Sequence, residues 1–494
     1  MSAIQITTCQ IAADIAAGRL TAVDAVERTL EQIEKVNPQL NAVCFKRYEE
    51  ARQEARAADR GKPVGPLHGV PITIKESLDL TGTPSTIGVP SRAHHRALHD
   101  HPYVARLREA GAIVVGKTNV AQALIYYESD NPLYGRTNNP HNLERTCGGS
   151  TGGEAAIIAA GGSPLGLGTD IGGSVRVPAH FCGVVGFKPT SGRLPVDSPI
   201  PIIKGQQAIQ AEAGLLARSV EDITLGLSVL TGNEFPPVGL STLKVAYYTD
   251  DGLLPAAPAI ERAVLEAADI LREAGATVSP WTPPDPYEAM NIYLRIGAAD
   301  GAKSLAKWIP KRERDPRIRD MIRVGRLSRP TLRLLESLLR LADQKTAANA
   351  LPNLGHHDTH HYWQAVEAQL HYRERFANAL DADLILCPPC ALPAFPHNTT
   401  RYLTIAGSYS ALYNLLGYPA GVVPFTTVQP TDIPTPRPTS DLVLRTAQKS
   451  LQQSADLPVG VQLIARPWQE HHALAAMRVI EQKNPQSRGP EGSH

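Results

Sequence analysis

The chain has 494 residues, of which 43% are hydrophobic and 20% are charged, proportions that are ordinary for a globular protein in water. Its formal net charge of +1 provides no overall field to attract a nucleic acid, and six cysteines are too few for a disulfide framework in a chain of this length. Because the first residues lack the basic and apolar segments of a signal peptide, and no window approaches 18 uninterrupted apolar residues, we expect a cytoplasmic protein without a membrane-spanning helix.

Residues 1–60 are predicted to form helices. Thr21 and Asp24 have the spacing of a helix N-terminal cap, and apolar residues recur behind them at helical intervals. From residue 65 onward, short apolar runs alternate with helical segments, a pattern typical of a layered α/β sheet. The expected strands span residues 69–74, 111–116, 243–248 and 382–386, and a helix is expected over 154–160.

Residues 311–340 form a basic segment, with ten Lys or Arg against four Asp or Glu and hence a local charge of +6. Ser328 can cap a helix over residues 329–341, in which leucines cover about half of the helical wheel. This helix could lie on an anionic membrane or cover an apolar substrate channel. The commoner arrangement, which we favour, is a helix that packs its leucines on the core and exposes its arginines.

Lys75 ends the apolar run of residues 70–75 (VPITIK), which is predicted to be a buried strand. A lysine carried into a protein interior loses hydration, and its pKa falls because the charged form is disfavoured. The neutral amine could then accept a serine proton, as in Ser-Lys variants of the catalytic triad. The alternative for this residue alone is a strand-end lysine whose ammonium group reaches water.

Ser150 lies in the glycine-rich segment 147–153 (CGGSTGG), which formally contains the G-x-S-x-G pattern of a nucleophile elbow. An elbow follows a hydrophobic strand, whereas residues 138–146 (NNPHNLERT) are polar and are predicted to form a loop. We therefore interpret Ser150 as a proton relay rather than as the attacking group.

Ser174 follows three residues, Ile171, Gly172 and Gly173, whose N–H groups could converge on one point because glycine permits the necessary turn. Convergent amides of this kind form an oxyanion hole. Taken alone, the segment could equally be a phosphate-binding nest or a plain turn. A lysine and two serines in such surroundings together predict an acyl-transfer hydrolase with Ser174 as the nucleophile.

Segments 147–160 and 166–188 (GLGTDIGGSVRVPAHFCGVVGFK) resemble the signature of the amidase signature family, and the resemblance extends to residues 458–467 (PVGVQLIARP). It implies an α/β fold, the amidase signature fold, with a central twisted mixed β-sheet covered by helices on both faces. By motif, Lys75 is the base, Ser150 the bridging serine and Ser174 the nucleophile, with a cis peptide bond between Gly149 and Ser150.

The implied organisation is one amidase domain over residues 1–494. Its parts are N-terminal helices over 1–60, a signature core over 65–235, a helical cap or substrate-channel region over 285–375, and the C-terminal part of the core over 376–480.

Within the family, segments 131–135 (NPLYG), 161–174 (GGSPLGLGTDIGGS) and 418–424 (YPAGVVP) look most like fatty acid amide hydrolases. The helix at 329–341 falls where that branch carries a membrane-facing cap. Thr151 replaces the second serine of the usual GGSSGG run, and Leu124 stands where a methionine lines the acyl site. The resemblance assigns Thr151 and Leu124 to the oxyanion and substrate-binding set, together with Ile171, Gly172 and Gly173.

The sequence thus predicts a serine amidohydrolase that acts through an acyl-enzyme on small-molecule amides with hydrophobic, fatty acyl or aryl groups. We expect no metal or organic cofactor, and a homodimer. One alternative is a carbamate, anilide or small-amide hydrolase of the same family. Another is a glutaminase subunit that passes ammonia to a partner. A non-catalytic nucleotide-binding module is disfavoured because no complete phosphate-binding fingerprint is present.

Two further motifs have ordinary interpretations. His357 and His361 have the spacing of a shared metal site on a helix, but no glutamate completes an HExxH motif, and a polar helix start is expected. Cys387 and Cys390 form a single CxxC, for which two buried thiols are expected rather than a redox pair.

Overall fold

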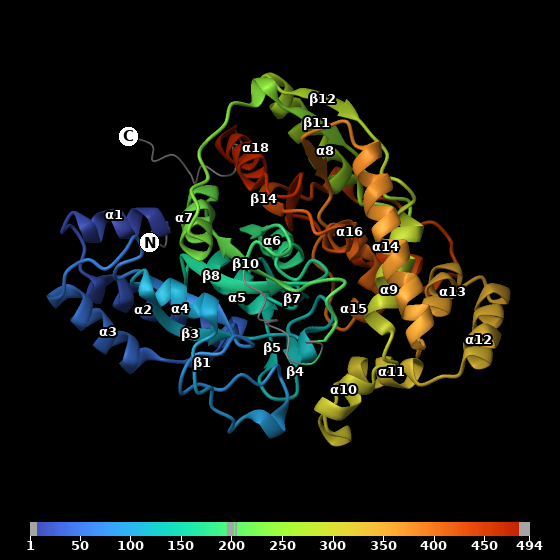
Figure 1. The fold of residues 1–494 in the computed structure, drawn as a ribbon, viewed down its shortest axis with the longest axis horizontal. Coiled ribbons are helices and arrows are strands. Elements are labelled where there is room, and N and C mark those ends of the chain that lie inside the picture. The colour runs from blue at the N-terminus through green and yellow to red at the C-terminus, as the bar shows by residue number, and fades with distance from the viewer. Residues whose placement is uncertain (1–6, 195–201, 203–204, 484–494) are drawn as a thin grey trace.

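The computed structural model describes residues 7–194, 202 and 205–483 (Figure 1). Parts of two expected segments, residues 1–6 of the N-terminal helices and residues 195–201 and 203–204 of the signature core, lie outside the described residues.

The described strands form one sheet of 11 strands in the order β1-β3-β2-β8-β10-β9-β14-β15-β13-β11-β12. The sheet is mixed, because β2 is parallel to β3 and β8 whereas β10 is antiparallel to both β8 and β9. The α/β class and the mixed sheet are therefore confirmed. Its strands are β1 (Val43–Lys46), β2 (Pro71–Lys75), β3 (Ile113–Thr118), β8 (Leu165–Asp170), β9 (Val185–Lys188), β10 (Glu212–Ala217), β11 (Lys244–Tyr247), β12 (Thr277–Pro280), β13 (Leu384–Cys387), β14 (Ala420–Thr427) and β15 (Pro458–Ala465).

Helices flank this sheet (Figure 1). Alternate strand residues enter different core clusters: Val114 packs in a cluster with α4 and α7, whereas Val115 packs in a cluster with α2, α3 and α5. This alternation follows from strand geometry, which points successive side chains to opposite faces. The helices of the N-terminal half are α1 (Thr8–Ala16), α2 (Ala22–Leu40), α3 (Tyr48–Arg60), α4 (Pro102–Glu109), α5 (Gly152–Ala159), α6 (Arg176–Cys182) and α7 (Val220–Thr231).

Two elements differ from the sequence expectation. Strand β1 interrupts the N-terminal helices and pairs with β3. Residues 138–146, expected to be a loop, contain a small antiparallel ribbon of β6 (Asn138–Asn139) and β7 (Asn142–Thr146). A second short ribbon pairs β4 (Asp130–Asn131) with β5 (Gly135–Arg136). Neither ribbon joins the 11-stranded sheet.

The second half of the chain adds a group of helices at one side of the sheet (Figure 1). Helices α10 and α11 pack with Leu124 and Ile171 in a separate apolar cluster, so this region reaches the predicted substrate-binding residues. The helices after α7 are α8 (Pro258–Glu273), α9 (Pro286–Ala298), α10 (Lys303–Trp308), α11 (Pro316–Gly325), α12 (Arg329–Leu341), α13 (Lys345–Ala350), α14 (Thr359–Ala379), α15 (Thr400–Leu403), α16 (Ser408–Leu416), α17 (Leu442–Leu451) and α18 (Glu470–Lys483).

Helix α12 has the predicted bounds, and Ser328 caps it by accepting the Thr331 N–H. The favoured interpretation, with leucines packed on the core and arginines exposed, holds only in part. Of its residues only Leu332 is buried, whereas Leu334, Leu338 and Leu341 are 62%, 52% and 85% exposed. Leu335 and Leu339 are half-buried, so one part of the apolar face of α12 packs on the protein and the other part meets solvent. Among the described residues, no helix combines the length and apolarity needed to cross a bilayer.

Candidate active site

Strand β2 carries Lys75 into the interior, where its side chain is fully buried, as predicted. Its Nζ lies 2.8 Å from Ser150 Oγ, 2.9 Å from Thr151 Oγ1 and 2.8 Å from Thr169 Oγ1, with the Thr169 carbonyl oxygen at 3.4 Å. Within the described residues, all these partners are uncharged oxygens. The surroundings can therefore accommodate a neutral amine.

Burial lowers the pKa of Lys75 from 10.5 to about 7, although the negative charges of Asp170 and Glu154 act in the opposite direction. Glu154, in the first turn of α5, is fully buried as well. Its carboxylate accepts hydrogen bonds from the hydroxyls of Thr73 and Thr118, at 2.6 and 2.8 Å. Burial nevertheless raises the pKa of Glu154 to about 8. With these pKa values, a large share of the Lys75 amine is uncharged at neutral pH, and most of the Glu154 carboxyl is protonated.

Ser150 precedes α5 and is 1% exposed. The peptide bond between Gly149 and Ser150 is cis, as the family resemblance implied. Residues 142–146 are extended as strand β7, but β7 lies outside the central sheet. Segment 147–153 therefore does not form the strand–turn–helix of a nucleophile elbow. Ser150 Oγ lies 2.8 Å from Lys75 Nζ, a contact that a proton relay would require.

Ser174 lies where the central strand β8 turns into helix α6, and it is 7% exposed. Gly173 makes this turn at φ +106°, a conformation that residues with a side chain rarely adopt. The Thr151 N–H donates to the Ser174 carbonyl oxygen at 3.2 Å and so ties the two serine-containing loops together. Within the described residues, the Ser174 hydroxyl makes no hydrogen bond, so of the three predicted catalytic residues only Lys75 and Ser150 are hydrogen-bonded to each other.

A buried ion pair holds the loop before Ser174. Arg176 donates to both carboxylate oxygens of Asp170, at 3.0 and 2.9 Å, and neither side chain is exposed. Arg176 also donates to Asn414 Oδ1 and Gln462 Oε1, at 2.6 and 2.8 Å. Although burial alone would raise the pKa of Asp170, the charge of Arg176 lowers it below its usual range. The pair is therefore ionised, and it anchors the loop.

The loop amides differ in their availability. Gly173 was expected to be one of the oxyanion donors. Its N–H instead donates to Asp170 Oδ1 at 2.8 Å, so in this structure it is not free to bind an oxyanion. In contrast, the N–H groups of Ile171, Gly172 and Ser174 have no hydrogen-bond partner among the described residues. A polar N–H group without a partner in such a site can bind a developing negative charge.

Two other predicted residues lie near this centre. Thr151 is fully buried and contacts Lys75, and its hydroxyl donates to the Thr169 carbonyl oxygen at 3.2 Å. It therefore lies on the lysine side of the site rather than with the oxyanion donors. Leu124 is buried in the apolar cluster that includes Ile171, the side expected for an acyl group. Thr169, which lies in the signature segment 166–188 but was assigned no role there, completes the surroundings of Lys75.

The other singled-out motifs have structural roles. Asp358 caps α14 by accepting the His361 N–H, the polar helix start that was expected. The described residues contain no cluster of His, Cys, Asp or Glu able to hold a metal ion. Cys387 and Cys390 are buried free thiols, also as expected.

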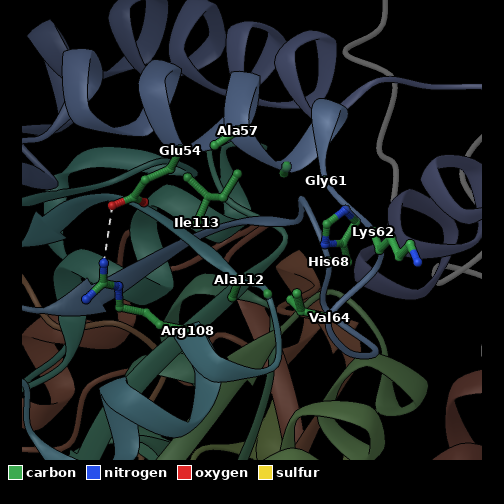
Figure 2. Close-up of a pocket in the computed structure, with 11 residues that line it drawn as sticks. Glu54, Ala57, Gly61, Lys62, Val64, His68, Arg108, Ala112 and Ile113 are labelled. Atoms are coloured by element: carbon green, nitrogen blue, oxygen red, sulfur yellow. Dashed lines mark hydrogen bonds and ion pairs between the residues drawn. The ribbon is translucent and has the colours of Figure 1, made fainter.

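A surface groove of about 330 Å³ lies apart from the predicted site residues, beside α3 and the start of β3 (Figure 2). Arg108 on its wall is paired with Glu54 at 3.3 Å and with Asp100 at 2.5 Å. Since these carboxylates compensate its charge, Arg108 is not available to a ligand as a free cation; the exposed Lys62 also lines the groove.

Most of the chain is similar to known proteins. A family model described as Amidase matches residues 24–474. The chain is 34% identical to Fatty acid amide hydrolase 1 of Caenorhabditis elegans, covering 96% of this chain and 87% of that protein. It is 31% identical to Acetamidase of Aspergillus oryzae, covering 95% and 88%. A solved structure of a fatty acid amide hydrolase matches with a TM-score of 0.81 and 25% identity, covering 97% of this chain and 85% of that chain.

Proposed function

This chain belongs to the Amidase family and is an amide-hydrolysing enzyme, and we propose that Ser174, Ser150 and Lys75 carry out the reaction. The observation that supports this most strongly is the burial of Lys75 among uncharged oxygens, with Ser150 Oγ 2.8 Å from its Nζ. A base must be deprotonated to act, and this environment favours the neutral amine.

In the proposed acylation, neutral Lys75 accepts the Ser150 proton while Ser150 accepts the proton of Ser174. The Ser174 oxygen attacks the amide carbonyl, and the free N–H groups of Gly172, Ile171 and Ser174 stabilise the oxyanion. The Ser174 hydroxyl must turn toward Ser150 for this step, an adjustment common when catalytic hydrogen bonds tighten on substrate binding.

An amine leaves poorly as an anion, so Ser150 returns the proton to the nitrogen before the C–N bond breaks. Water then attacks the acyl-enzyme and is activated by the same relay. Hydrolysis releases the acid and restores the Ser174 hydroxyl.

We propose hydrophobic amides, with fatty acyl or aryl groups, as substrates. Leu124 and Ile171 lie in one apolar cluster with α10 and α11, which supports an apolar acyl-binding region. The similarity to a fatty acid amide hydrolase points the same way, whereas the similarity to an acetamidase makes small amides the alternative to test.

Labelling with a fluorophosphonate, followed by an acyl-length series of primary amides, tests both proposals. We expect label on Ser174, its loss in Ser174→Ala, and kcat/KM that rises from acetyl to palmitoyl amides. Label on another residue would refute the assigned nucleophile. A flat or falling series would instead favour small amides or carbamates, and glutamine as the preferred substrate would favour a glutaminase subunit.

We further propose that α12 contacts an anionic membrane surface. Its exposed leucines lie on a helix that also carries Arg333 and Arg340, within the segment of charge +6. Apolar and basic faces on one helix suit the interface of an anionic bilayer.

Sedimentation with vesicles tests this contact. The protein should bind vesicles that contain phosphatidylserine, and Leu334→Asp with Leu338→Asp should abolish binding. The matched control is Leu370→Asp, because Leu370 is 57% exposed on α14 and lies outside α12. Equal binding by all variants, or no binding by the wild-type protein, would contradict the proposal.

A further inference from the structure

Two tyrosine hydroxyls bind the back of the loop that precedes Ser174. The Tyr293 hydroxyl, from α9, donates to the Ile171 carbonyl oxygen at 3.1 Å. The Tyr127 hydroxyl, from the loop after β3, donates to the Gly172 carbonyl oxygen at 2.6 Å. Burial raises the pKa of both phenols above the usual range, so both remain protonated donors at the pH values at which the enzyme would act.

The geometry of the peptide group links these carbonyls to the loop amides. In a planar trans peptide, the C=O of one residue and the N–H of the next point in opposite directions. The bond from Tyr293 to the Ile171 carbonyl therefore directs the Gly172 N–H away from Tyr293, and that N–H has no partner among the described residues.

The following peptide group is held at both of its ends. The Tyr127 hydroxyl donates to its carbonyl oxygen, which belongs to Gly172. Its N–H, which belongs to Gly173, donates to Asp170 Oδ1 at 2.8 Å. Glycine has little intrinsic preference between backbone conformations, so a Gly-Gly pair needs such contacts to remain in one orientation. Tyr293 also packs tightly there, because a Cβ on Gly172 would lie 2.4 Å from its hydroxyl oxygen.

We propose that Tyr293 and Tyr127 are positioning residues that fix the two peptide planes of the oxyanion loop, so that the Gly172 N–H faces the developing negative charge. The inference rests on the proposed function of Ser174. The hydroxyls also polarise the peptide groups to which they donate, which strengthens an N–H of the same group as a donor. Through Tyr293, helix α9 of the cap region supports the oxyanion loop directly.

Tyr293→Phe and Tyr127→Phe test the proposal, because phenylalanine keeps the ring and removes only the hydroxyl. We expect kcat to fall about 10- to 100-fold in each variant, since a misdirected oxyanion donor weakens binding of the transition state. KM should stay within about twofold, because the ground-state carbonyl depends little on that donor. The control is Tyr372→Phe, which removes a buried tyrosine hydroxyl that donates to the Pro284 carbonyl oxygen just before α9; it tests whether loosening the start of α9, with the Tyr293 hydroxyl kept, lowers kcat.

A second measurement separates positioning from loss of structure. A trifluoromethyl ketone analogue of the substrate forms a tetrahedral adduct with the serine, and its affinity should fall in Tyr293→Phe by the same factor as kcat. The affinity for the product acid should not change. If Tyr293→Phe retains the kcat of Tyr372→Phe, or if kcat, KM and acid affinity all change together, the inference is overturned. A failure of the proposed function would give a different result, because the wild-type enzyme would then carry no fluorophosphonate label on Ser174.

Discussion

Raising the pH through about 7 should switch on amide hydrolysis, because the base assigned to Lys75 acts only as a neutral amine. Burial lowers the pKa of this lysine from 10.5 to about 7. Below that value the ammonium form predominates and cannot accept the Ser150 proton, and above it the neutral amine predominates. The rate should therefore rise with pH and then reach a plateau.

The size of the effect follows from the two pKa values. An ordinary lysine presents roughly one neutral amine in 1,000 at pH 7.5, whereas a lysine with a pKa of about 7 presents roughly three in four. The difference in the free energy of protonation is about 5 kcal/mol. Nearly all of the base's activity at neutral pH thus depends on the burial of Lys75.

The assay is kcat/KM for a chromogenic anilide between about pH 5.5 and 9.5. Lys75→Ala should lose the rising limb together with most of the activity. Glu154→Gln should retain the limb and move it little, because a carboxyl group with a pKa of about 8 is already mostly uncharged near pH 7. A limb near pH 10 in the wild-type enzyme, or a limb that persists in Lys75→Ala, would refute the reasoning.

Three further predictions concern the surroundings of the site. Arg176→Met should reduce the free energy of unfolding by about 3–5 kcal/mol, since it leaves Asp170 buried without its partner; a loss below about 1 kcal/mol in urea titrations would contradict this. Gly172→Ala should abolish most turnover because its Cβ would meet the Tyr293 hydroxyl, whereas Gly205→Ala, at a position with open space, should leave kcat unchanged. Leu334→Asp should change the melting temperature little, whereas the buried Leu332→Asp should cost about 2–4 kcal/mol; equal effects would place α12 against the core.

Local signals predicted their elements well. The bounds of α12 and its Ser328 cap followed from residues within one helix, as did the cap formed by Thr21 on the N–H of Asp24. The ribbon in residues 138–146 was missed because its strands are short and polar, with no alternation to indicate them. The exposed face of α12 could not be predicted, since an amphipathic pattern is the same whether its apolar side meets a core or solvent.

The candidate site was predicted in part. Lys75, Ser150 and Ser174 lie in glycine-rich or apolar motifs that are visible in the sequence. Their supporting residues come from distant elements: Asn414 from α16, Gln462 from β15 and Tyr293 from α9. Such contacts depend on the sheet order, which no local pattern determines. The hydrogen bond from the Gly173 N–H to Asp170 could not be predicted either, because it depends on the orientation of the Asp170 side chain within its own loop.

The protonation state of Lys75 is the most direct test of the mechanism. We propose an NMR titration of the enzyme with ¹³C-labelled lysine, in which the Cε resonance of Lys75 is assigned by its loss in Lys75→Arg. The mechanism predicts that this resonance titrates near pH 7. A resonance that remains that of an ammonium group up to about pH 10, the behaviour of an ordinary lysine, would contradict it.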